Sequence, residues 1–238
     1  MRNTRRRAAA VLLGATAIVA AGTYNLAHGA SPRPRAANAD ASRISPSEAA
    51  ARAIAPHYGA VALIGDSLSL QSNLEEQAQL RIAGWGPITH NAWFGRRTPS
   101  DPMTLAPLSG IAAVQEVRAQ TPDPETWIIE LGTNDISVTH DNAPAMRSVI
   151  DAMLATIGPG HRIVWVNIHN GFDLRSSATF NRVLDEVAAE RNDLVVADWA
   201  SQAPHVGYLV ADHIHLTAEG QAAFAKVIAG AADLVTLR

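Results

Sequence analysis

Short apolar runs alternate with longer amphipathic runs along this chain, and this alternation limits the possible folds more than any other feature. Most of the short runs are continuous β-branched or apolar stretches, which is typical of strands buried on both faces. We expect five strands, over Val61–Ile64, Ile88–Ala92, Trp127–Leu131, Arg162–Ile168 and Leu194–Asp198.

Amphipathic segments of helical length separate the expected strands. A Gly158-Pro159-Gly160 cluster ends one of them sharply, as glycine and proline do. Strand–helix alternation predicts a parallel sheet with helices on both faces, because right-handed crossovers pack each helix against the sheet. The expected helices are Asn73–Ile82, Ser109–Ala119, Ala143–Ile157, Ser177–Arg191 and a last helix from Ala218 to about Val235.

Residues 1–30 carry a different signal. Three consecutive arginines from Arg5 precede an apolar run over residues 8–22, and small residues follow up to Ala30. A basic start, a short apolar run and a small-residue exit are typical of a secretory signal peptide. A membrane span needs about 20 apolar residues, so an uncleaved N-terminal anchor is the alternative. Both interpretations place the rest of the chain outside the cytoplasm, secreted or at the cell surface.

Residues 31–57 are expected to connect that segment to a single domain. Prolines among small polar residues over 31–47 are typical of a flexible linker. Ser47 can then cap a short helix that leads into the domain. We therefore expect the folded domain over residues 58–238.

The composition excludes several kinds of chemistry for this chain. The chain has 238 residues and no cysteine, which excludes disulfides, thiolate metal sites and cysteine nucleophiles. Its formal net charge is -3, and no basic domain points to nucleic acid. Hydrophobic residues make up 47% of the chain, enough to build a core without disulfides. The search for a nucleophile is therefore directed to serine.

Two polar motifs directly follow expected strands. Gly65-Asp66-Ser67 follows the first strand, and Gly132-Thr133-Asn134-Asp135 follows the third. Parallel sheets gather working residues at the carboxyl ends of their strands. There the Ser67 hydroxyl can act as a nucleophile, and the Asn134 amide can donate to a developing oxyanion. As structure alone, both motifs are turns and helix caps. Ser69 stands where G-x-S-x-G needs its second glycine, which argues against an ordinary α/β-hydrolase.

Asp212-His213-Ile214-His215 supplies an acid and two histidines before the last helix. Asp212 and His215 are three residues apart, so one helical turn can bring them together. A histidine that takes a proton from serine needs a partner that fixes its tautomer, usually a carboxylate. His213 is the alternative base, and the His-x-His pair also allows a metal site, although no further ligand cluster supports one.

In this order, the motifs resemble those of the SGNH, or GDSL, hydrolase family. Gly65-Asp66-Ser67 matches the family's nucleophile block, Gly132–Asp135 its asparagine block and Asp212–His215 its terminal D-x-x-H block. Gly95 fits the glycine block expected after the second strand. The resemblance covers residues 61 to about 228. It implies a flavodoxin-like three-layer α/β/α sandwich with a five-stranded parallel sheet.

The resemblance also implies the chemistry. Ser67 is the expected nucleophile, His215 the base and Asp212 the acid that orients it. The implied oxyanion hole consists of the N–H groups of Ser67 and Gly95 and the amide of Asn134. The expected function is a secreted serine esterase that hydrolyses acyl or acetyl esters through an acyl-enzyme on Ser67, with no metal or organic cofactor.

Residues 93–97 depart from the glycine-rich stretch that many family members have after the second strand. With Asp198-Trp199, they make the chain similar to SGNH domains of extracellular peptidoglycan and polysaccharide O-acetyltransferases. O-acyl transfer to or from cell-envelope carbohydrate is therefore the first alternative, although the chain lacks the multi-span region often fused to those domains. A non-catalytic envelope-binding module is the second alternative. We expect substrate contacts from Trp93, Arg96 and His169.

The expected partner is a small ester or an acylated cell-envelope carbohydrate. No nucleic acid is expected, and contact with a membrane is expected only through an uncleaved N-terminal anchor. The sequence carries no signal for an oligomeric state.

Overall fold

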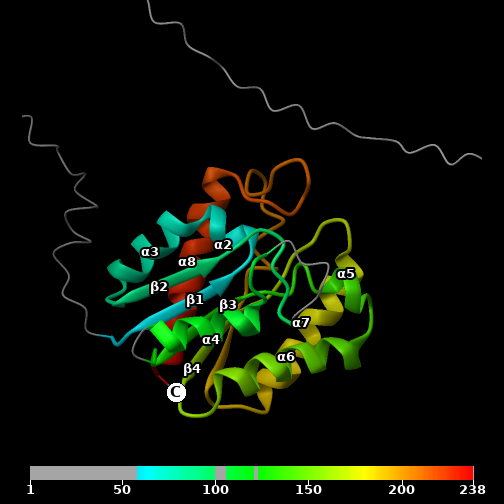
Figure 1. Ribbon diagram of the computed structural model, residues 1–238. Coiled ribbons are helices and arrows are strands. Elements are labelled where there is room, and N and C mark those ends of the chain that lie inside the picture. Colours follow the sequence, from blue (N-terminus) through cyan, green and yellow to red (C-terminus); the bar gives the residue numbers. More distant parts are fainter. Residues whose placement is uncertain (1–57, 100–105, 121–122, 238) are drawn as a thin grey trace, which may run out of the picture. The chain divides into compact units, whose positions relative to one another are not determined.

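The computed structural model describes residues 58–99, 106–120 and 123–237, which contain a five-stranded sheet with helices on both faces (Figure 1). The strand order is β2-β1-β3-β4-β5, and every pairing is parallel. The predicted three-layer α/β/α sandwich is therefore confirmed. The segments predicted over residues 1–57 lie outside the described residues. The strands are β1 (Val61–Gly65), β2 (Ile88–Ala92), β3 (Thr126–Glu130), β4 (Arg162–Val166) and β5 (Leu194–Ala197).

Two groups of helices cover the sheet. On one face α4, α6 and α7 pack over the strands, and on the other α3 and α8 lie against each other and against the sheet (Figure 1). Two short helices, α2 and α5, are the next elements after β1 and β3 in the chain. The helices are α2 (Ser67–Gln71), α3 (Asn73–Ile82), α4 (Gly110–Gln120), α5 (Ile136–Thr139), α6 (Ala143–Ile157), α7 (Leu174–Ala189) and α8 (Ala218–Val235).

Alternate strand residues supply two separate hydrophobic cores. In β1, Ile64 faces the core under α4, α6 and α7, whereas Leu63 faces the core under α3 and α8. This follows from the two-residue period of a strand, because successive side chains point to opposite faces. Both faces are covered, so the central strands read as continuous apolar runs. The edge strand β2 instead carries polar residues that are only half-buried.

The predicted element bounds differ from the observed ones where side chains bind the backbone. Helix α7 begins at Leu174 and not at Ser177, because the Asp173 carboxylate accepts the Ser176 N–H and caps the helix earlier. Strand β4 ends before Ile168, whose N–H and C=O are both bound by the side chain of Asn181. The short helices α2 and α5 were not expected.

The carboxyl ends of the strands carry the predicted polar motifs. Asp66 and Ser67 follow β1, residues 93–97 follow β2, and the Gly132–Asp135 turn follows β3. His169 follows β4. Within the described part of the chain, no helix combines the length and apolar character that crossing a membrane requires.

Two phenylalanines test how much this core contributes. Phe180 on α7 is 0% exposed and packs against Trp165 of β4, with ring centroids 6.5 Å apart. We expect Phe180→Ala to lower the free energy of unfolding in urea by about 3–5 kcal/mol, because it leaves a cavity. Phe172, 72% exposed, is the matched control. Phe172→Ala should change the free energy of unfolding by less than about 0.5 kcal/mol. Equal losses in the two variants would contradict this account of the core.

Candidate active site

Ser67, His215 and Asp212 form a continuous chain of hydrogen bonds at the carboxyl edge of the sheet. The Ser67 hydroxyl lies 3.0 Å from His215 Nε2, and His215 Nδ1 lies 2.7 Å from Asp212 Oδ2. A carboxylate only accepts, so Nδ1 carries the proton and Nε2 is left to accept from the serine. The structure therefore brings together the three residues predicted as nucleophile, base and orienting acid.

Asp212 is held ionised by the turn in which it lies. Partial burial pushes its pKa up, but the hydrogen bond from His215 and the N–H groups of His215 and Ile214 outweigh this and hold the pKa at about 2. Those two backbone N–H groups donate to Oδ1 over 2.9 and 3.0 Å. The turn thus fixes both the charge and the orientation of the acid.

His213, the alternative base, points elsewhere. Its ring packs edge-on against Phe172 with centroids 6.4 Å apart, and its carbonyl accepts the Gly171 N–H at 3.0 Å. Its backbone φ of 53° lies in the left-handed region, which is uncommon for a residue with a side chain. Among the described residues, no group of three or more histidines, aspartates or glutamates is arranged to hold a metal.

Asn134 lies beside the nucleophile turn. Its Nδ2 donates to Asp66 Oδ2 over 2.9 Å, and its carbonyl accepts the Ser137 hydroxyl at 2.7 Å. An amide nitrogen carries two hydrogens, so the bond to Asp66 orients Asn134 and leaves the second N–H for another acceptor.

The loop after β2 approaches the end of β1. The Trp93 N–H donates to the Gly65 carbonyl over 3.2 Å, and Gly95 has a φ of 63°, a conformation that favours glycine. Trp93 is 45% exposed, so it is not a core residue and its surface is open to a ligand. This loop brings the predicted oxyanion-hole glycine to the same edge as Ser67.

Arg96 does not suit the substrate contact that the sequence predicted. It is 2% exposed, and its guanidinium donates to the carbonyls of Gly65, Asn91 and Leu108 and to the Asn91 side chain. A guanidinium bound in this way ties the loop to the ends of β1 and β2. The sequence places an arginine in a loop but cannot show that backbone carbonyls surround it.

Asp135 anchors the far end of the same loop, which the sequence did not reveal. Its carboxylate accepts the Thr98 N–H at 3.0 and 3.2 Å and the Thr98 hydroxyl at 2.9 Å. Burial raises its pKa to about 6, although the Thr98 hydrogen bonds work in the opposite direction. The loop that carries Gly95 is therefore fixed to the Asn134 turn.

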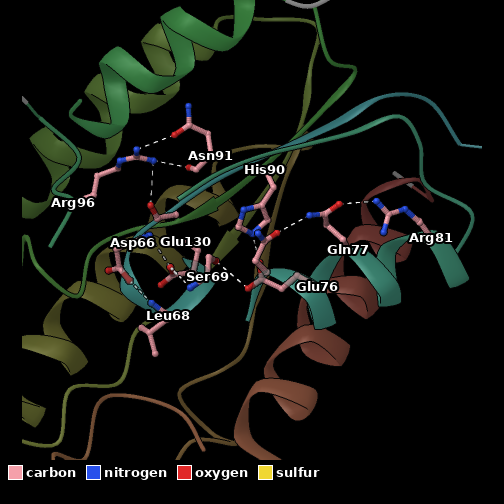
Figure 2. A network of polar contacts seen from close by, with 12 residues as sticks. Asp66, Leu68, Ser69, Glu76, Gln77, Arg81, His90, Asn91, Arg96 and Glu130 are labelled. Atoms are coloured by element: carbon pink, nitrogen blue, oxygen red, sulfur yellow. Dashed lines mark hydrogen bonds and ion pairs between the residues drawn. The ribbon is translucent and has the colours of Figure 1, made fainter. Parts of the chain in front are cut away.

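A buried polar network joins Asp66, Ser69, Glu76, His90 and Glu130 (Figure 2). Glu130, at the end of β3, accepts the N–H groups of Asp66 and Ser69, and Glu76 on α3 contacts Ser69 and His90. Asp66, Glu76 and Glu130 are all at most 2% exposed. The one sequence signal for this network is an acid, Glu130, inside an apolar strand pattern.

His169 lines a cavity of about 460 Å³ beside His213. Burial and the nearby His213 lower the pKa of His169, which favours a neutral ring that can both donate and accept a hydrogen bond. The cavity is also lined by apolar residues of the segment before α8, including Ala203, Pro204, Val206 and Leu209.

The sequence profile of the GDSL-like lipase/acylhydrolase family matches residues 63–223, more than half of the chain and all of the geometry above. The chain belongs to this family. It is therefore a serine hydrolase of the ester-hydrolase class, as the sequence predicted. A search of curated proteins found no match.

Solved structures share the family fold. An aryl esterase from M. smegmatis has a TM-score of 0.61 at 14% identity, with 75% of this chain and 100% of that chain covered. A carbohydrate acetylesterase family member from Sinorhizobium meliloti has a TM-score of 0.59 at 18% identity, covering 76% and 100%. The C-terminal catalytic domain of peptidoglycan O-acetyltransferase A from Streptococcus pneumoniae has a TM-score of 0.54 at 21% identity, covering 77% and 94%.

Gly65 of the GDSL-family nucleophile motif has no room for a side chain. An added Cβ would lie 2.5 Å from Ser69 Cβ and 3.2 Å from Glu130 Oε2. We expect Gly65→Ala to lower the free energy of unfolding by about 1–3 kcal/mol through overpacking, measured in urea. Gly230→Ala in α8, where nothing lies within 4 Å, should raise it slightly, because alanine favours a helix by about 1 kcal/mol over glycine. An unchanged free energy of unfolding in Gly65→Ala would show that the turn can accommodate a side chain.

The buried Asp135 predicts a pH dependence of stability. Its pKa is about 6 in the folded protein against an ordinary 3.8, so the folded state binds the extra proton between these values. Stability should therefore fall as pH rises from about 4 to 6, by on the order of 3 kcal/mol, and then level off. Asp135→Asn should remove this part of the difference between unfolding free energies at pH 4 and pH 7. An unchanged difference in the variant would contradict the assignment.

Proposed function

We propose that this chain is an exported serine esterase that hydrolyses small acyl esters, acetyl esters included, through an acyl-enzyme on Ser67. The observation that carries the proposal is the hydrogen-bonded chain from Ser67 through His215 to Asp212. A serine alone is a weak nucleophile, and a base with a fixed tautomer activates it. The chain has that base within 3.0 Å of the hydroxyl.

The reaction follows from the positions of these groups. The Ser67 oxygen attacks the ester carbonyl carbon while its proton passes to His215 Nε2, and ionised Asp212 stabilises the imidazolium that forms. The N–H groups of Ser67 and Gly95 and the second N–H of Asn134 bind the developing oxyanion. Collapse of the tetrahedral intermediate breaks the bond to the alcohol, which leaves with the proton from His215. Water then attacks the acyl-enzyme with His215 as base, releasing the acid and Ser67.

Small esters of hydroxylated alcohols, such as acetylated carbohydrates, fit the surroundings best. The cavity beside His213 offers the neutral imidazole of His169, which can bond a sugar hydroxyl, next to apolar walls. The exposed ring of Trp93 offers a stacking surface at the opposite loop. The similar solved structures include a carbohydrate acetylesterase family member and the catalytic domain of a peptidoglycan O-acetyltransferase. The basic and apolar pattern of residues 1–30 supports export.

Substitutions at the site test the mechanism. Ser67→Ala should abolish hydrolysis of p-nitrophenyl acetate, and Asn134→Ala should lower kcat by about 10²–10³-fold, because one oxyanion donor is lost. Ser148→Ala, at an exposed serine on α6, is the control and should match the wild type. Wild-type hydrolysis by Ser67→Ala would overturn the proposal.

Two further measurements define the substrate. Rates with acetyl, butyryl and octanoyl p-nitrophenyl esters report which acyl length the enzyme prefers, and we expect the acetyl ester to be preferred.

Added carbohydrate acceptors separate hydrolysis from transfer, since a transferase would form acylated sugar at the expense of free acid.

A further inference from the structure

The start of α2, from its cap residue Asp66 to Ser69, presents four backbone N–H groups around the nucleophile, and buried carboxyl groups bind three of them. Glu130 Oε2 accepts those of Asp66, at 3.0 Å, and Ser69, at 3.3 Å. Asp66 Oδ1 accepts that of Leu68 at 3.0 Å. The N–H of Ser67 has no acceptor among the residues that the structure describes, so it is the group left for the oxyanion.

Ser69 is held from a second direction. Its hydroxyl donates to Glu76 Oε1 over 3.0 Å, and Glu76 Oε2 lies 2.8 Å from His90 Nε2 on β2 (Figure 2). Ser69 and Glu76 are 0% exposed. A helix of 5 residues has little stability of its own. Contacts from β2, β3 and α3 therefore fix the turn that carries the nucleophile.

We propose that Glu130 is a positioning residue for ester hydrolysis: its carboxyl group occupies the Asp66 and Ser69 N–H groups and so aims the Ser67 N–H and hydroxyl at the reacting carbonyl. The inference rests on the proposed function. Glu130 acts through the turn, since its bonds go to the residues on either side of Ser67.

The surroundings of Glu130 favour its neutral form. Burial raises its pKa well above the usual value, and the charges of Asp66 and Glu76 raise it further. Five other ionisable groups lie around this network. His90 is bound to Glu76, and Arg96 is bound to the Gly65 carbonyl. The charge of Glu75 acts on Glu76, and those of His215 and Asp135 interact with Asp66. A neutral carboxyl group accepts through one oxygen and donates through its O–H. Its side chain is hydrogen-bonded to that of Asp66.

Two replacements of similar size separate the hydrogen bonds of the Glu130 side chain from the space that it fills. Glutamine keeps an accepting oxygen and gains a donating N–H, so Glu130→Gln copies the neutral carboxyl group. Methionine fills the space with neither, so Glu130→Met removes the hydrogen bonds without leaving a large cavity. Ile150→Ala is the control for lost stability, because Ile150 is a buried residue of α6 in the core on one face of the sheet.

The experiment measures kcat and KM for p-nitrophenyl acetate at pH 7, per active site counted with a fluorophosphonate that labels Ser67. We expect Glu130→Met to lower kcat about tenfold to a hundredfold with KM changed less than about twofold, because misplaced catalytic groups slow the chemical step. Glu130→Gln should keep kcat within about threefold, because the amide oxygen can still accept the Asp66 and Ser69 N–H groups. Ile150→Ala should lose thermal stability but keep kcat per site.

Each outcome decides one question. A wild-type protein that neither reacts with the probe nor hydrolyses the ester would overturn the proposed function and this inference with it. An active wild type with unchanged kcat in Glu130→Met would overturn the inference alone. If Glu130→Met fails to fold, Glu130→Gln decides, and a large loss of kcat in that variant would overturn the inference.

Discussion

The register of the parallel sheet is the constraint on which the site depends. Gly65, the last residue of β1, is paired with Ala92 of β2 on one side and with Glu130 of β3 on the other. Three strands therefore end at the same level, and the chain leaves each of them with a polar turn. Ser67, Gly95 and Asn134 are 28 to 67 residues apart in pairs, yet this register brings their turns to one edge of the sheet. A shift of one residue would turn the strand side chains to the opposite faces.

The close packing behind the nucleophile carries an energetic cost. Asp66, Glu76 and Glu130 are removed from water, which disfavours their charged forms and raises their pKa values. Backbone N–H groups of the nucleophile turn offset part of that cost by donating to two of these carboxyl groups. Burial of these carboxyl groups lowers the stability of the fold but holds the turn rigid. This is common where catalytic groups must be oriented before the substrate binds.

The sequence predicted those parts of the structure that local patterns determine. Apolar runs predicted the five strands and the sheet, because burial on both faces leaves a clear pattern. The motif positions predicted that Ser67, Asp212 and His215 belong together. Arg96 and Glu130 escaped prediction for a shared reason: the carbonyls around the first and the N–H groups around the second come from distant segments. Helix α2 was missed because its stability comes from those same tertiary contacts.

Two aspartates of this site show how surroundings assign roles to identical side chains. Asp212 is partly exposed and accepts two backbone N–H groups and the His215 ring, so its pKa falls to about 2. Asp66 is fully buried beside Glu130, and burial raises its pKa to about 6 despite similar hydrogen bonds. Only the first is a secure negative charge for an imidazolium. The second orients Asn134 and caps the nucleophile turn. Charge and orientation are thus supplied by separate carboxyl groups.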